Sequence, residues 1–205
     1  MLSLSATLPT TMQLPPQQAL VQLMLQLQNN GLDLSQAYAA RQTALELEKV
    51  VTVERLSSMA GVQTSLAAID ALEALVAEHR ALVQQWLVEA TRQIVPLLEE
   101  HPLDQRKEIS EGLRSALQRQ MEHQHLSLQA RAEWIAAARA IFGLARRARE
   151  LDPDVERSLF ADEADFDEAE RQGERMDAAA AAEQRLQEAL AARIRARLEQ
   201  LQPPS

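Results

Sequence analysis

The sequence contains no cysteine, so it can form neither a disulfide framework nor a thiolate metal site. Aromatic residues make up only 3% of its 205 residues, and the whole chain has five glycines and eight prolines. Strands favour aromatic and β-branched residues, whereas the alanine, leucine, glutamine, glutamate and arginine that are abundant here favour helices. The composition therefore predicts an all-α protein, and the lack of cysteine suits the cytoplasm without excluding export.

The amino terminus lacks the features of a secretory signal. Residues 1–15 have no basic start and no long apolar core, and no stretch of the chain approaches the roughly 18 uninterrupted apolar residues of a membrane span. We therefore expect a cytoplasmic protein without a membrane-spanning helix. Residues 1–15, rich in Ser, Thr and Pro, are predicted to be a disordered leader; alternatively, they are a non-cleaved export signal like those of bacterial type III substrates.

The net charge is confined to one stretch. Residues 150–177 hold twelve acidic side chains and three arginines, and this local balance of −9 equals the net charge of the whole chain. Charge at this density must be solvated, placed at a helix end, bound to a cation or docked on a basic partner. This stretch is therefore the first place to search for a function.

Glycine and proline positions divide the amino-terminal part into helices. Pro16 can open a helix that Asn29-Asn30-Gly31 would end through a left-handed cap. A second helix is expected from about residue 33 or 35 to Met59. Gly61, followed by Thr64 and Ser65, marks either a turn with a new N-cap or a weak point in one long helix.

The remaining breaks are set by prolines. A helix over residues 66–100 should kink or end early at Pro96, and a loop over residues 101–104 leaves Asp104 as the next N-cap. A helix over residues 105–151 follows. Asp152-Pro153 then begins a last helix that reaches Gln202, with Gly173 as a point of interruption.

The apolar spacing predicts how these helices pack. Leu128, Ile135 and Phe142 recur every seven residues, and wide stripes of this kind are typical of a bundle core. His79 falls within such a stripe, so we expect a buried, hydrogen-bonded histidine. The predicted fold is an antiparallel bundle of long helices over residues 16–151, with a short amino-terminal amphipathic helix. Residues 152–205 form an acidic elbow and an extended carboxy-terminal helix with the stripe Leu186, Leu190, Ile194, Leu198 and Leu201.

The amino-terminal helix is amphipathic but carries no charge. Its apolar stripe either docks on the bundle itself or forms an interface with a partner or a second copy. Membrane-surface helices usually carry Lys or Arg on the polar face, and this helix has none, so membrane association is disfavoured. The stripe consists of Leu20, Leu23, Met24 and Leu27.

Two patterns suggest metal binding weakly. Glu122 and His125 have the Glu-x-x-His spacing of carboxylate-bridged di-iron bundles, but those bundles need two copies and this chain has one. Residues 152–163 place acids at positions 1, 3, 5 and 12 of a calcium loop, yet Arg157 replaces the glycine that the turn requires. We therefore expect no metal or other cofactor.

Two arginine clusters flank the acidic stretch. Nucleic-acid binding is disfavoured, because the chain is acidic overall and neither cluster contains a base-stacking aromatic. The first cluster could instead face the acids across the Asp152-Pro153 joint. The clusters are Arg139, Arg146, Arg147 and Arg149, and Arg185, Arg193, Arg195 and Arg197.

No catalytic motif is present at an interpretable spacing, so the sequence favours a non-enzymatic interaction protein: an adaptor, assembly factor or scaffold. Its partner would be a protein with a basic surface, and a homo-oligomer is an open alternative. The alternatives are a solvated helix face, an exported bacterial effector or secretion-associated accessory protein, and a metal-binding helical bundle. Besides the amino-terminal stripe, the candidate site is the acidic segment, residues 162–170, with Asp162, Glu163, Asp165, Phe166, Asp167, Glu168 and Glu170.

Overall fold

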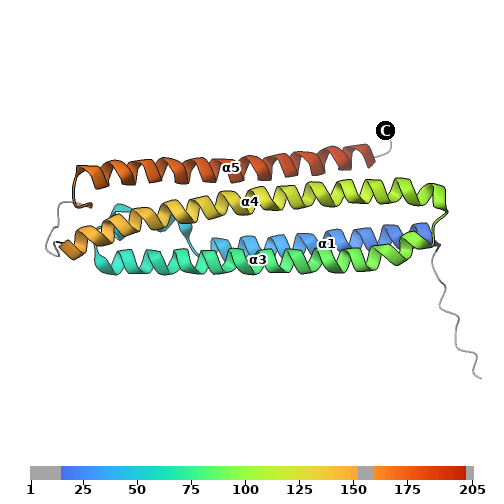
Figure 1. Cartoon of the computed structure of the whole chain (residues 1–205), viewed down its shortest axis with the longest axis horizontal. Coiled ribbons are helices and arrows are strands. Elements are labelled where there is room, and N and C mark those ends of the chain that lie inside the picture. The colour runs from blue at the N-terminus through green and yellow to red at the C-terminus, as the bar shows by residue number, and fades with distance from the viewer. Residues whose placement is uncertain (1–14, 152–158, 202–205) are drawn as a thin grey trace, which may run out of the picture.

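The computed structural model describes residues 15–151 and 159–201, which form helices and turns but no strand (Figure 1). The predicted all-α bundle of long helices is confirmed. Its elements are α1 (Pro16–Thr43), the 3-10 turn η1 (Leu47–Lys49), α2 (Val53–Leu56), α3 (Met59–Glu99), α4 (Leu103–Leu151) and α5 (Glu163–Leu201).

Successive long helices run antiparallel (Figure 1). α3 packs against α1, α2 and α4, and α5 packs along α4. We call the end of the bundle that holds the α3–α4 connection the loop end, and the opposite end the α2 end. α1 begins at the loop end, beside the place where α3 ends (Figure 1).

The main core lies toward the α2 end. Its most deeply buried large side chains are Phe142, Ile69, Leu72 and Val62, and the predicted repeat Leu128, Ile135 and Phe142 belongs to it. His79 is buried and stacks on Tyr38 of α1, with ring centroids 4.4 Å apart, which confirms the prediction of a core histidine. A smaller cluster at the loop end joins Leu27, Ala90 and Ile94.

The predicted break at Asn29-Asn30-Gly31 is wrong, because α1 continues to Thr43. Gly31 has no positive φ, and a Cβ on it would lie 3.4 Å from Cζ2 of Trp86 in α3. Gly31 therefore lies inside α1 opposite Trp86, where a Cβ would be at an ordinary contact distance, and it does not end the helix. The chain turns later, where Glu46 takes a left-handed conformation with φ 47°.

The predicted helix from residue 33 to Met59 is also wrong, since residues 44–58 contain η1 and α2. Ser58 caps α3, its Oγ accepting a hydrogen bond from the Gly61 amide at 3.0 Å. Gly61 is neither a turn nor a weak point, since it lies in the first turn of the continuous helix α3, and a Cβ there would lie 2.4 Å from the Arg55 carbonyl oxygen. Ser65 does not cap a helix either, because its hydroxyl donates to the Val50 carbonyl at 2.8 Å.

The later helices follow the predictions more closely. α3 contains Pro96 and ends at Glu99, and α4 begins at Leu103, so Asp104 lies in its first turn instead of capping it.

Residues 152–158, with the predicted cap at Asp152 and most of the calcium loop, lie outside the described part. Residues 159–162 are not helical, so α5 begins at Glu163 and not near Pro153, and it runs through Gly173 without a break.

The expectation that no helix could span a membrane needs correction for α3. In the described part of the chain, this one helix is long and apolar enough to cross a membrane by length and composition. Its most apolar 18-residue stretch has a mean hydropathy of 1.3 and is 33% buried in the bundle. The core helix of a bundle has the same character, and α1, α2 and α4 all pack against α3.

Candidate protein-binding surfaces

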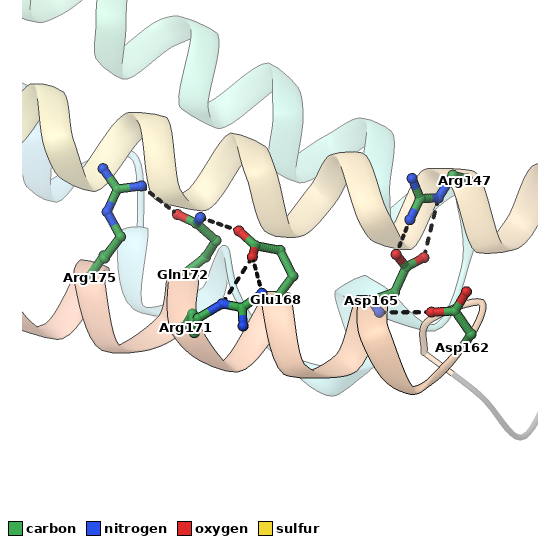
Figure 2. Close-up of polar contacts among 7 residues, drawn as sticks. All are labelled: Arg147, Asp162, Asp165, Glu168, Arg171, Gln172 and Arg175. Atoms are coloured by element: carbon green, nitrogen blue, oxygen red, sulfur yellow. Dashed lines mark hydrogen bonds and ion pairs between the residues drawn. The ribbon is translucent and has the colours of Figure 1, made fainter.

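The helical period of α5 divides the acidic segment into an inward and an outward set. Asp165 points inward, is only 5% exposed, and accepts a hydrogen bond at 3.2 Å from Nε of Arg147 in α4, with a second contact to the same guanidinium (Figure 2). Asp162 caps the helix, its Oδ1 accepting from the Asp165 amide at 2.8 Å. These two carboxylates are therefore used within the fold.

The first arginine cluster faces the acids only in part. Arg147 does so as predicted, whereas Arg139 turns to α3 and pairs with Asp70 and Glu73, each at 2.6 Å. Arg149 is buried and donates to the Leu56 carbonyl at 3.2 Å. The cluster thus joins α4 to α2, α3 and α5.

Glu168 lies on the flank of α5. Its carboxylate accepts hydrogen bonds from Gln172 Nε2 at 2.5 Å and from Arg171 Nε at 3.0 Å (Figure 2). These two donors, Gln172 first, lower the pKa of Glu168 below the usual glutamate value. The negative charge of Glu168 is therefore partly balanced by Arg171 of its own helix.

The outward set forms what we call the outer face of α5. Spacings of three and four residues place its members on one side of the helix, and all of them are exposed. Its acids make no hydrogen bond or ion pair with any residue that the structure describes. Phe166 is 55% exposed and meets buried Phe160 edge-on, with ring centroids 6.2 Å apart. The outer face consists of Glu163, Phe166, Asp167, Glu170, Glu174 and Asp177.

A second charged cluster lies inside the bundle. Arg131 of α4 pairs with Glu183 of α5, and their side chains are only 9% and 12% exposed. Tyr38 of α1 lies beside them, and burial raises its pKa above the usual tyrosine value. The pair therefore joins helices in the interior and presents no surface to a partner.

The amino-terminal stripe faces largely inward. Leu20 and Leu27 are buried and Leu23 is partly buried, with Leu23 and Leu27 packed in the loop-end cluster beside Ile94 of α3, while Met24 is 36% exposed. The structure thus places most of the stripe on the bundle itself, one of the two alternatives that the sequence left open. The exposed apolar residues of α1 are Val21, Met24, Leu25 and Leu32.

The sequence did not reveal an apolar groove between α3 and α4 at the loop end. It has a volume of about 830 Å³. Glu122 and His125 line it too, but no group of three His, Cys, Asp or Glu that could hold a metal ion exists among residues 15–151 and 159–201. Its apolar lining is Ile94, Val95, Leu98, Leu113, Leu117 and Met121. In the sequence these residues only widen helical stripes, so nothing distinguished a groove from a core.

Comparisons with known proteins found no matching family model, no matching curated protein and no matching solved structure. A function must therefore be argued from the surfaces of this chain alone.

Proposed function

We propose that this chain is a non-enzymatic helical interaction protein, an adaptor, assembly factor or scaffold, that binds a basic segment of a partner protein through the outer face of α5. One observation carries the proposal: the acids of that face are exposed and unpaired among the described residues, whereas Asp162, Asp165 and Glu168 are engaged within the bundle. Internal ion pairing therefore accounts for only part of the acidic surplus.

Phe166 gives this face the composition of a binding site. Interfaces draw most of their energy from a few large side chains, commonly aromatic, surrounded by polar groups. Here an exposed ring lies among Glu163, Asp167 and Glu170. Complementary charges at the rim of an interface speed encounter and select a basic partner, and salt weakens that contribution.

Partner capture with two matched variants tests the proposal. One variant carries Glu163→Gln, Asp167→Asn and Glu170→Gln; the control carries Glu100→Gln, Glu108→Gln and Glu111→Gln, an equal charge change at exposed acids of the loop end. The wild-type chain should capture a partner from lysate at low ionic strength and lose most of it at high ionic strength. The outer-face variant should capture little at either, and the control should behave like wild type.

Phe166→Ala separates a specific site from a solvated acidic face. It leaves the charge unchanged but removes the anchor, so capture at low salt should fall by roughly tenfold or more, as for a residue worth at least about 1.4 kcal/mol in binding. If the outer-face variant and Phe166→Ala both retain every partner of the wild-type chain, the acids of α5 are only solvated.

The export alternative depends on residues 1–15, of which 1–14 lie outside the described part. The metal alternative depends on Glu122 and His125. Neither gains support from a further contact in the structure.

A further inference from the structure

We propose that residues 1–14 of this chain bind in the α3–α4 groove as an extended segment, with the side chains of the even-numbered residues directed into it. This goes beyond the outer face of α5 and does not depend on it.

The segment has a two-residue pattern that only Thr10 interrupts. In an extended chain, successive side chains point to opposite sides, so alternating residues share one side. The even positions from 2 to 14 are apolar except for Thr10, and the odd positions from 3 to 13 hold only Ser, Thr, Gln and Pro. The even set is Leu2, Leu4, Ala6, Leu8, Thr10, Met12 and Leu14. Such alternation is typical of an extended segment buried on one side, in contrast to the disordered leader that the composition predicts.

The groove lacks a cover among the described residues. Toward the α2 end, Arg139 bridges α4 to Asp70 and Glu73 of α3 and closes the junction of these two helices with charge. At the loop end the same junction is open and apolar, and Val95 and Met121 remain 47% and 55% exposed. Arg114 and Glu122 also line the groove, but covering its apolar residues with apolar side chains removes those residues from water.

The segment is attached at the correct end and is long enough. It joins α1 at Pro15, at the loop end, where α1 packs against Ile94 and Leu98, two residues that also line the groove (Figure 1). Fourteen extended residues reach roughly 46 Å. The groove follows α4 from Ser110 to His125, which is about 22 Å of helix.

Tethering favours this occupant over a second copy. A segment joined by a short linker is present at an effective concentration on the order of millimolar, well above that of a separate molecule in dilute solution. The segment also carries no charged side chain that would lose hydration in the groove.

The absence of cysteine makes a direct test possible, because any introduced pair is the only pair. In the full chain, Thr10→Cys is combined with Ser110→Cys, which lines the groove, or with Ser115→Cys, an exposed serine of the same helix outside the groove lining. Under mild oxidation the 10–110 pair should form an intramolecular disulfide about tenfold faster than the 10–115 pair. Equal rates would overturn the proposal, and a product mainly between chains would assign the groove to a second copy.

A second pair of variants tests the two-residue pattern. Leu4→Asp with Leu8→Asp places charge on the apolar side, whereas Ser5→Asp with Thr7→Asp places the same charge one residue away on the polar side. The first should lower the 10–110 cross-linking rate to that of the 10–115 pair, and the second should leave it unchanged. Equal effects of both would show that the segment is not held in this orientation.

Discussion

At the scale of single residues, Gly61 matters because α2 occupies the space of a side chain. A Cβ there would lie 2.4 Å from the Arg55 carbonyl oxygen and 2.8 Å from the Arg55 Cα. Both are backbone atoms, which cannot turn aside as the end of a long side chain can. The short helix α2 therefore keeps its place against α3 only if residue 61 is glycine.

Gly61→Ala should destabilise the fold by about 1–3 kcal/mol, because backbone must shift to admit the methyl group. Gly112→Ala is the matched control: it also lies within a helix, but a Cβ there meets nothing within 4 Å. That variant should gain about 0.5–1 kcal/mol from the better helix propensity of alanine. Urea unfolding followed by helical circular dichroism measures both, and equal shifts would contradict the close approach of α2.

Removing one partner of the Arg131–Glu183 pair should destabilise the fold more than replacing both partners with leucine. Glu183→Leu leaves a buried guanidinium without its carboxylate, so it should cost about 3–5 kcal/mol, and adding Arg131→Leu should recover much of that loss. Urea unfolding of the single and double variants gives the coupling free energy. Glu89→Gln breaks the exposed pair with Arg92 and should change the free energy of unfolding very little, because solvent screens exposed ion pairs. A loss for Glu183→Leu no larger than for Glu89→Gln would contradict the burial of the pair.

His79 and His123 should make stability depend on pH. Burial lowers the pKa of both below the usual histidine value of 6.5, and Arg193 lowers that of His123 further. The unfolded chain therefore takes up protons at a higher pH than the folded chain does. The contribution of these two histidines to the free energy of unfolding is therefore fully present above pH 6.5. It is lost as the pH falls through their pKa values in the folded chain.

Urea midpoints at roughly pH 7.5 and 5.5, on either side of the ordinary histidine pKa, measure this loss. The combined variant His79→Gln with His123→Gln should reduce the difference between the two midpoints. His125→Gln, at an exposed position, should leave it unchanged. An undiminished difference in the double variant would assign the pH effect to other groups.

At the scale of the helices, α5 depends on its first turn. Asp162 accepts the amide hydrogen of Asp165, and that residue in turn pairs with Arg147 of α4, so the start of the helix and its docking are linked. Neighbouring acids thus differ in their contacts: Asp162 caps the helix, Asp165 pairs with α4, and Asp167 faces solvent.

Asp162→Ala should cost about 1 kcal/mol through loss of the cap. Hydrogen exchange should accelerate at the first amides of α5 while α3 is unaffected. Asp167→Ala removes an exposed acid of the same helix that has no bond to a described residue, and it should change neither measurement. If both substitutions act alike, charge and not the cap stabilises the start of α5.

Long periodic helices and the break at Pro102 could be predicted from the sequence, whereas the breaks around α2 and the start of α5 could not. α4 was expected over residues 105–151 and spans Leu103–Leu151, because its apolar repeat continues without interruption. Gly31 resembles a helix end in sequence, yet it lies inside α1, opposite Trp86 of α3, and α1 continues to Thr43. The real turn uses left-handed Glu46, a residue with no turn signature.

The candidate site could also be predicted only in part from the sequence. The sequence located the acidic segment but gave Asp165 the same standing as Asp167. Only the packing of α5 on α4 brings Arg147 to one and leaves the other facing solvent. The apolar groove was missed because side chains that line an open groove and side chains that fill a core have the same helical spacing.

At the scale of the whole molecule, the main core lies at the α2 end of the bundle, and the apolar groove lies at the loop end. The large side chains with almost no exposure, Val62, Ile69, Leu72 and Phe142, belong to the main core. The loop end has a cluster of only a few buried residues beside the groove. The two ends should therefore differ in local stability.

Native-state hydrogen exchange should show this difference. Amides around Ile69 to Leu72 and around Phe142 should exchange at least about tenfold more slowly than those of the first two turns of α1, where few apolar contacts hold the helix. Uniform protection along α1, α3 and α4 would contradict an uneven bundle.

The order of packing also has a consequence for biosynthesis. Each long helix packs chiefly on the long helix next to it in the chain: α1 with α3, α3 with α4, and α4 with α5. Chains whose contacts are local in sequence fold rapidly, since little loop-closure entropy is lost before a contact forms. Each helical hairpin can therefore form as it leaves the ribosome, and α5, made after α4, then covers that helix.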